Sequence, residues 1–341
     1  MYILRNIRWQ VVLAFAWRYL LIFTIWNTVV YFGCHFLEHK GVNLHLPFQP
    51  ISTIGIAVAF YLGFKNNASY DRFWEARKIW GGIVNYSRTW ANQVLHFVTN
   101  HHAIEKLSAD QLHKIHHELI YRHIAYINAL RLNLRKPSAT NAVHHKNRVR
   151  RKYSHDSPGD EHWLSDVTPF LSESEYLNYC KAKNPPTQIN RVQGAQLRKY
   201  GEDMGLIDDF RHMEMMRVLE EFYNLQGKCE RIKHTPFPRQ YGFFSKVFTW
   251  IFIILLPFGL IGEFAKMGHD FEFLVIPFCV LISWVFMTME LVGDNSEDPF
   301  ENFINDVPMT ALCRTIEIDL RQMLGETELP EKTTATNGVL L

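Results

Sequence analysis

Residues 51 to 82 carry an apolar stretch that runs without a break into a polar one: ISTIGIAVAFYLGFKNNASYDRFWEARKIWGG. In the apolar half, Ile56, Phe60 and Phe64 recur at i, i+4 and i+8, so a helix places all three on one face. Small residues, which let neighbouring helices approach closely, stand between them: Gly55, Ala57, Ala59 and Gly63. Such a stripe can line a hydrophobic constriction, which gates ion flow by expelling water. By spacing alone, packing against lipid or protein is the commoner reason for such a stripe.

The polar half contains amide and charged side chains that could act on ions beyond a constriction. The candidates for an ion vestibule are Asn66, Asn67, Asp71, Arg72 and Glu75. Two interpretations stay open: a charge network on the helix surface, with Arg72 or Lys78 reaching a neighbouring subunit, or a vestibule that tunes selectivity. An apolar neck has no fixed charge to choose between anions and cations, so the sequence leaves the sign of the permeant ion open.

Composition excludes several other classes of protein. The 341 residues carry a net charge of only +2, which argues against nucleic-acid binding. Five cysteines are scattered without a C-x-x-C pair, which argues against a disulfide framework or a zinc site: Cys34, Cys180, Cys229, Cys279 and Cys313. His113 and His117 have the i, i+4 spacing of metal ligands, but Lys114 stands where H-E-x-x-H needs glutamate, and surface or interface histidines are the favoured interpretation. We expect no metal, no cofactor and no enzyme activity.

Four apolar segments are expected to span a membrane. They run from Trp9 to Leu37, from Pro50 onward, from Val247 to Gly262, and between Glu272 and Glu290. The second has only 14 residues from Ile51 to Phe64, short of the ~20 that a span needs, so we expect its neighbours to shield it from lipid. The first segment is too long for a signal peptide and lacks a small-residue cleavage site.

Lysine and arginine predict the orientation of these spans. The two short loops between spans hold only Lys40 and Lys266, whereas the other flanks are rich in basic residues: Arg5, Arg8, Lys65, Arg72, Arg77, Lys78, Lys228, Arg231, Lys233, Arg239 and Lys246. Both termini and the central block should therefore face the cytoplasm, with the chain in the inner (plasma) membrane.

The central block, 83 to 238, has helical periodicity and no convincing strand pattern. Residues 138 to 166 are predicted to form a surface loop. It contains a basic cluster, for which simple exposure to solvent is the favoured interpretation over a site for anionic lipid or nucleic acid: Arg148, Arg150, Arg151 and Lys152. The tail after Leu329 reads as disordered. The expected fold class is all-α, with divisions 1–82, 83–240, 241–294 and 295–341.

Four stretches resemble the bacterial branch of the bestrophin family. They are FKNNASYDRFWEARKIWG (64–81), the NPP turn (184–186), GKCERIKHTPFPRQY (227–241) and EDPFENFINDVPM (297–309). Their order and spacing match the family over roughly residues 5 to 325. The resemblance implies a homopentameric ion channel with one central pore, four transmembrane helices per subunit and a mostly helical cytosolic body. Its partners would be further copies of the chain, membrane lipids and permeant monovalent ions.

The resemblance also implies site residues. Family members have a neck of three apolar residues on the second helix, which alignment on Arg72 to Trp74 places at Ile56, Phe60 and Phe64. A second, cytosolic constriction near the NP turn points to Ile189. Animal members bind calcium through an acidic run after the fourth helix, but here the run is broken, EDPFEN at 297 to 302, and we expect no calcium site. Anchoring of the tail is the favoured role for Glu297, Asp298 and Asp306.

Family members in animals pass chloride, and some bacterial members look cation-selective. Two functions from other classes compete with a channel. A membrane-anchored scaffold or ligand-binding protein would need a convergent set of functional groups, and none is evident. A secondary transporter would need inverted repeats and broken helices, and no internal repeat is evident.

Overall fold

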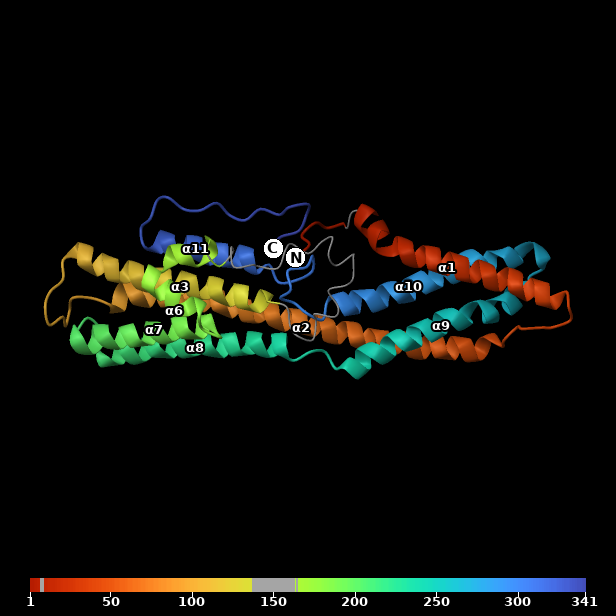
Figure 1. The fold of residues 1–341 in the computed structure, drawn as a ribbon, viewed down its shortest axis with the longest axis horizontal. Coiled ribbons are helices and arrows are strands. Elements are labelled where there is room, and N and C mark those ends of the chain that lie inside the picture. Colours follow the sequence, from red (N-terminus) through yellow and green to blue (C-terminus); the bar gives the residue numbers. More distant parts are fainter. Residues whose placement is uncertain (7–8, 137–162, 164) are drawn as a thin grey trace. The chain divides into compact units, whose positions relative to one another are not determined.

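The computed structural model describes residues 1–6, 9–136, 163 and 165–341, and within that part of the chain the fold is all-helical. The only β-type pairings among these residues are isolated bridges, Tyr2 with Val339 and Thr336 with Val339. The helices are α1 (Trp9–Glu38), α2 (Phe48–Phe97), α3 (Ala109–Arg135), η2 (Thr168–Phe170), α6 (Glu173–Cys180), α7 (Pro185–Arg198), η3 (Lys199–Asp203), α8 (Asp209–His234), α9 (Arg239–Ala265), η4 (His269–Leu274), α10 (Val275–Asn295) and α11 (Met309–Met323) (Figure 1). The expected all-α class is confirmed.

The chain forms two compact units, and α2 contributes to both. The first, here called the apolar unit, comprises Leu4–Arg72 and Pro236–Glu297; the second, the polar unit, comprises Met1–Ile3, Phe73–Thr235 and Asp298–Leu341. The units therefore divide at 72, 235 and 297, against sequence-based divisions at 82, 240 and 294. The long helix continues from one unit into the other because residues 64 to 74 contain no proline and no glycine that could break it.

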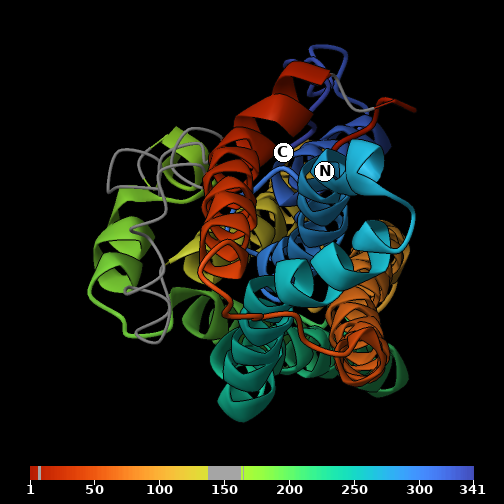
Figure 2. The same cartoon turned by 90° about the vertical axis from the view of Figure 1, so that its right-hand side faces the viewer.

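In the apolar unit, α1, α9 and α10 lie side by side (Figure 1), and Figure 2 views them from their ends. Their shared core is aliphatic and aromatic, with Phe23 of α1, Leu62 of α2 and Met287 of α10 almost fully buried. Pro257 lies inside α9, whereas Pro277 lies in the first turn of α10, where its missing N–H removes no helical hydrogen bond. Pro50 likewise lies in the first turn of α2, as expected.

Three helical segments are long and apolar enough to cross a membrane: Ala16–Glu38, Arg239–Ala265 and Asp270–Asn295. Much of their apolar surface faces outward, as with Phe32 at 63% and Phe36 at 60% exposed. Soluble monomers rarely expose apolar surface on this scale, which marks a membrane protein. The start of α2 is not among these three, so four spans per chain remains an expectation.

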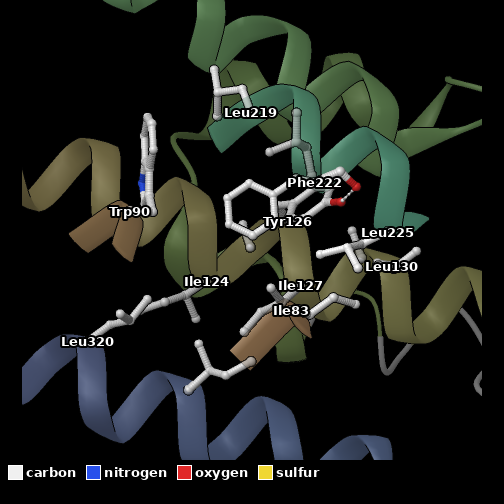
Figure 3. Close-up of a cluster of buried hydrophobic side chains, with 14 of the residues drawn as sticks. Ile83, Trp90, Ile124, Tyr126, Ile127, Leu130, Leu219, Phe222, Leu225 and Leu320 are labelled. Carbon is white, nitrogen blue, oxygen red and sulfur yellow. Dashed lines mark hydrogen bonds between the residues drawn. The ribbon is translucent and has the colours of Figure 1, made fainter. Parts of the chain in front are cut away.

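The polar unit has its own core (Figure 3), in which α3 contacts α7, α8 and α11. Trp90, Tyr126 and Phe222 are buried at its centre, and the Tyr126 hydroxyl donates to the Phe222 carbonyl oxygen at 3.1 Å.

Side-chain caps fix where two helices of the polar unit begin. Ser108 and Gln111 form a reciprocal capping box at α3, and Asp208 accepts from the Arg211 N–H at α8.

One sequence expectation changes at the C-terminal end of this unit. The tail from Pro330, expected to be disordered, is ordered: the Leu340 N–H donates to the Met1 carbonyl oxygen at 2.8 Å, and the Ile3 N–H donates to the Gly338 carbonyl oxygen at 2.9 Å. Backbone pairing between the two chain ends compensates for the tail's weak hydrophobicity, and local composition could not show it. The basic cluster at 148 to 152 lies outside the described residues.

Candidate pore-lining site

The first part of α2 has one buried and one exposed face. Burial recurs every three or four residues along it, at Ile51, Gly55, Val58, Leu62, Lys65 and Ser69. This is the spacing of a single helix face, and it packs against the α9 and α10 side chains of the apolar unit. The opposite face is therefore available to partners outside the chain.

The predicted neck residues lie on that opposite face. Ile56, Phe60 and Phe64 are 71%, 69% and 62% exposed, among the highest values for apolar side chains in the apolar unit. The Phe60 and Phe64 rings meet edge to face, with centroids 4.7 Å apart and planes at 86°. The structure thus brings the three side chains together as one apolar stripe. Because all three are largely exposed, packing inside the chain is not the reason for the stripe.

Two of the small residues have different roles. A Cβ on Gly55 would lie 2.7 Å from the Phe252 ring, so glycine is needed there for α2 to approach α9. A Cβ on Gly63 would meet nothing within 4 Å, because Gly63 lies on the exposed face beside Phe64. Gly55 therefore positions the stripe, while Gly63 leaves space next to it.

A buried ion pair, which sequence reasoning missed, holds the end of this segment. The Lys65 Nζ lies 2.6 Å from Glu290 Oε1, and the two side chains are 1% and 4% exposed. Glu290 Oε2 accepts a hydrogen bond from the Ser245 hydroxyl at 2.5 Å, so α2, α9 and α10 meet at one carboxylate. From the sequence, Lys65 counts only among the basic flanks that predict orientation, and Glu290 only bounds the fourth apolar segment. The sequence signal for this pair was an ionisable residue of opposite charge at the end of each of two apolar segments.

The vestibule candidates separate into exposed and engaged side chains. Asn67 and Asp71 continue the exposed face beyond Phe64, and the Asn67 amide lies 3.5 Å from an Asp71 carboxylate oxygen. Asn66 is partly buried, and its side-chain oxygen lies close to Gly293. Arg72 donates from Nε to the Glu297 carbonyl oxygen at 2.8 Å, a partner in its own chain.

Glu75, the last vestibule candidate, forms an ion pair with Arg231 at 2.5 Å inside the polar unit. Both side chains are well exposed, at 42% and 61%, and such pairs contribute little to stability. Among the vestibule candidates, Asn67 and Asp71 are therefore the two that continue the exposed face of the stripe.

Ile189 does not fit the predicted cytosolic constriction. Its side chain is 0% exposed and belongs to the core of the polar unit. The NP turn explains this, because Asn184 caps α7, Pro185 begins it, and the next helical turn points Ile189 inward. A side chain buried within its own chain cannot line an ion path in this conformation.

The comparisons with known proteins agree on a family. The family model described as "Bacterial/Fungal Bestrophin protein" matches residues 1–322. The chain is a bestrophin.

Several relatives are similar over most of their length. The voltage-dependent anion channel-forming protein YneE of Escherichia coli K12 is 28% identical over 313 residues, covering 92% of this bestrophin and 88% of the relative. The protein of that description from Ralstonia nicotianae, RSc3414, is 29% identical over 323 residues, covering 95% and 91%. The crystal structure of a bacterial bestrophin homologue from Klebsiella pneumoniae superposes with a TM-score of 0.74 at 26% identity, covering 91% of this chain and 98% of that one.

The acidic segment after α10 is used for anchoring in this bestrophin. Lys233 of α8 and Glu301 form a buried ion pair at 3.1 Å, and Asp306 accepts from the Phe303 N–H at 3.0 Å. Glu297 pairs with Arg239 at 3.3 Å. Within the described residues, no group of three or more histidine, cysteine or acidic side chains is arranged to hold a metal ion. His117, one of the two histidines with the spacing of metal ligands, stacks on the ring of Tyr121, with ring centroids 3.7 Å apart.

Proposed function

We propose that this bestrophin is an anion-conducting channel of the inner membrane, with the exposed stripe of α2 as its hydrophobic neck. The observation that carries the proposal is the outward placement of Ile56, Phe60 and Phe64 on a helix whose opposite face is fully packed. The relatives named as voltage-dependent anion channel-forming proteins support the choice of anions, chloride among them.

One stripe on one helix cannot enclose a path, so the proposal needs several copies around an axis. We assign five, in keeping with the family resemblance, and a homopentamer would present fifteen apolar side chains in three rings. The start of α2, too short to span alone, would then be shielded by α9 and α10 on one side and by neighbouring copies on the other. It would count as the fourth membrane segment, with both termini in the cytoplasm.

Conduction in this channel is passive. Ions would enter a hydrated vestibule past Asn67 and Asp71 and meet the neck, where the Phe60 and Phe64 rings leave little room for a hydration shell. A dry apolar neck blocks ions until side-chain rotation or a helix shift wets it. No covalent step or cofactor enters this mechanism.

The experiment is a flux assay in proteoliposomes under asymmetric chloride, with planar-bilayer recording of the reversal potential. The Ile56→Ala/Phe60→Ala/Phe64→Ala variant should conduct more than the unsubstituted channel, because smaller side chains let the neck hydrate. A matched control is Ile25→Ala/Phe32→Ala/Phe36→Ala on α1, where the same residue types are 56%, 63% and 60% exposed. That control should leave current unchanged.

Three outcomes would count against the proposal. Equal currents from both triple variants would remove the neck assignment. A reversal potential at the cation equilibrium value would remove anion selectivity. A purified particle of one subunit that passes no ions would favour the membrane-anchored scaffold instead.

A further inference from the structure

A cavity in the polar unit, away from α2, combines arginines from two helices. It has a volume of about 360 Å³ and lies between α3, η2 and α11. Its polar lining includes Tyr121, Asn128, Arg131, Thr310, Arg314 and Glu317. The volume is at the lower end of the ~300–1,000 Å³ of small-molecule sites, which limits an occupant to a small ligand.

Arg131 is the buried cation of this cavity. Its side chain is 5% exposed, and its Nη2 lies 2.5 Å from the Asp166 carboxylate. Its Nε–H, also buried, has no hydrogen-bond partner among the residues that the structure describes. A guanidinium offers five donors, and an unused buried donor is unfavourable. Arg131 therefore brings a buried positive charge to the cavity wall, with part of its donor capacity unused.

Thr310 links Arg131 to a second, partly buried arginine. Its hydroxyl oxygen accepts from Arg135 Nη2 at 2.7 Å and from Arg131 Nη1 at 3.4 Å. With both lone pairs occupied, the hydroxyl proton of Thr310 is free to be donated. Burial and the neighbouring Arg131 lower the pKa of Arg135 to about 10, as expected where positive charges gather away from water.

Arg314 completes the cationic lining from α11. It is 38% exposed and donates from Nη1 to Glu317 at 2.8 Å, which uses one of the five N–H donors of its guanidinium. Arg321, also in the lining, is by contrast engaged by Glu317, Glu326 and the Glu328 carbonyl oxygen. Including Arg135, four arginines gather here.

We propose that this cavity binds a small oxyanion, a carboxylate or a phosphate, held by Arg131, Thr310 and Arg314. The planar fork of a guanidinium matches paired oxygens of carboxylate and phosphate groups, a match that a halide ion does not provide. The site would therefore recognise a ligand distinct from the permeant halide, and the proposal does not depend on conduction.

Thermal unfolding of the purified detergent-solubilised protein tests this site. Inorganic phosphate and succinate are titrated separately at constant ionic strength, with chloride making up the balance. We expect either anion to raise the Tm by several degrees in a saturable way, since a ligand that binds only the folded state stabilises it. A response to one anion alone supports the site and assigns its chemistry as phosphate or carboxylate.

Two variants localise the effect. Arg314→Gln, at a partly exposed position, should weaken the apparent affinity roughly tenfold or more, as expected for a lost charged hydrogen bond. The control Arg198→Gln, whose side chain is 72% exposed on α7 and pairs with Glu202, should keep the full response. Equal responses of both variants, or no response beyond that to chloride, would overturn the proposal. The Tm without added anion reports whether each variant folds.

Discussion

The Lys65 ammonium and the Glu290 carboxylate form an ion pair of 2.6 Å at the back of the helix that carries the apolar stripe. Lys65 follows Phe64 directly, yet the lysine is 1% exposed and the phenylalanine 62%. A rotation of α2 that turned Phe64 inward would pull Lys65 away from its partner. The pair therefore selects the face that α2 presents.

Breaking this pair should destabilise the protein strongly. Lys65→Met leaves an uncompensated buried carboxylate, which costs about 3–5 kcal/mol. Lys65→Met/Glu290→Gln should recover most of that loss, because no buried charge remains and the amide can still bond Ser245. The measurement is Tm in detergent. Lys266→Met is the control: that lysine, 70% exposed, pairs with Glu263 and should contribute under about 1 kcal/mol. Equal effects of Lys65→Met and Lys266→Met would contradict this role.

Gly55 and Gly63 provide a matched test of how α2 is packed. Gly55→Ala places a Cβ 2.7 Å from the Phe252 ring, and overpacking of this kind costs about 1–3 kcal/mol. Gly63→Ala meets nothing within 4 Å and should gain up to about 1 kcal/mol of helix propensity. Tm should fall in the first variant and hold or rise in the second. The opposite order would mean that α2 packs through its other face.

His123 should make the stability of the polar unit depend on pH. Burial lowers its pKa to about 3. Below pH ~6.5, His123 is therefore protonated in the unfolded chain but stays neutral in the folded chain. Stability is therefore present above that pH and lost as pH falls, by up to about 1.4 kcal/mol per unit from this group.

The variant His123→Phe isolates that contribution. Ser87, which lies 2.9 Å from His123 Nε2, still donates to the Ile83 carbonyl oxygen at 2.7 Å, so removal of the imidazole leaves the hydroxyl paired. Tm measured from pH 7 to pH 4 should fall less steeply in this variant. His113→Phe, at an exposed position of the same helix, should retain the original slope. If His123→Phe does so as well, the imidazole is charged in the folded state.

Asp71 should influence ion selectivity if the exposed face of α2 borders the ion path. Asp71→Asn removes a negative charge from that face and should shift the reversal potential toward the chloride equilibrium potential. Glu202→Gln, where glutamate is 67% exposed in the polar unit, removes the same charge elsewhere and should leave the reversal potential unchanged. An equal shift in both variants would point to overall charge instead of a local effect.

Part of this organisation could be predicted from sequence. The i, i+4, i+8 spacing placed Ile56, Phe60 and Phe64 on one face because helical geometry alone relates those positions. Hydropathy located three of the membrane helices, since apolar runs of that length have few other uses. Family motifs at 64–81 and 297–309 pointed to the bestrophins, to which the chain belongs.

Other features depend on residues that only folding brings together. Ile189 was predicted from its distance to the NP turn, but the packing of α7 in the polar unit buries it. The ordered tail depends on backbone pairing with Met1 and Ile3, at the other end of the chain. The cavity of Arg131, Thr310 and Arg314 joins helices that are far apart in sequence.

The sequence by itself determined that α2 has an apolar stripe, because periodicity is local. Which side of α2 turns outward was decided by the tertiary structure, through the Phe252 ring against Gly55 and the Glu290 carboxylate on Lys65. Both contacts join residues about 200 positions apart or more. Steric fit and charge pairing at such separations exist only once α9 and α10 have packed against α2, and no local pattern encodes them.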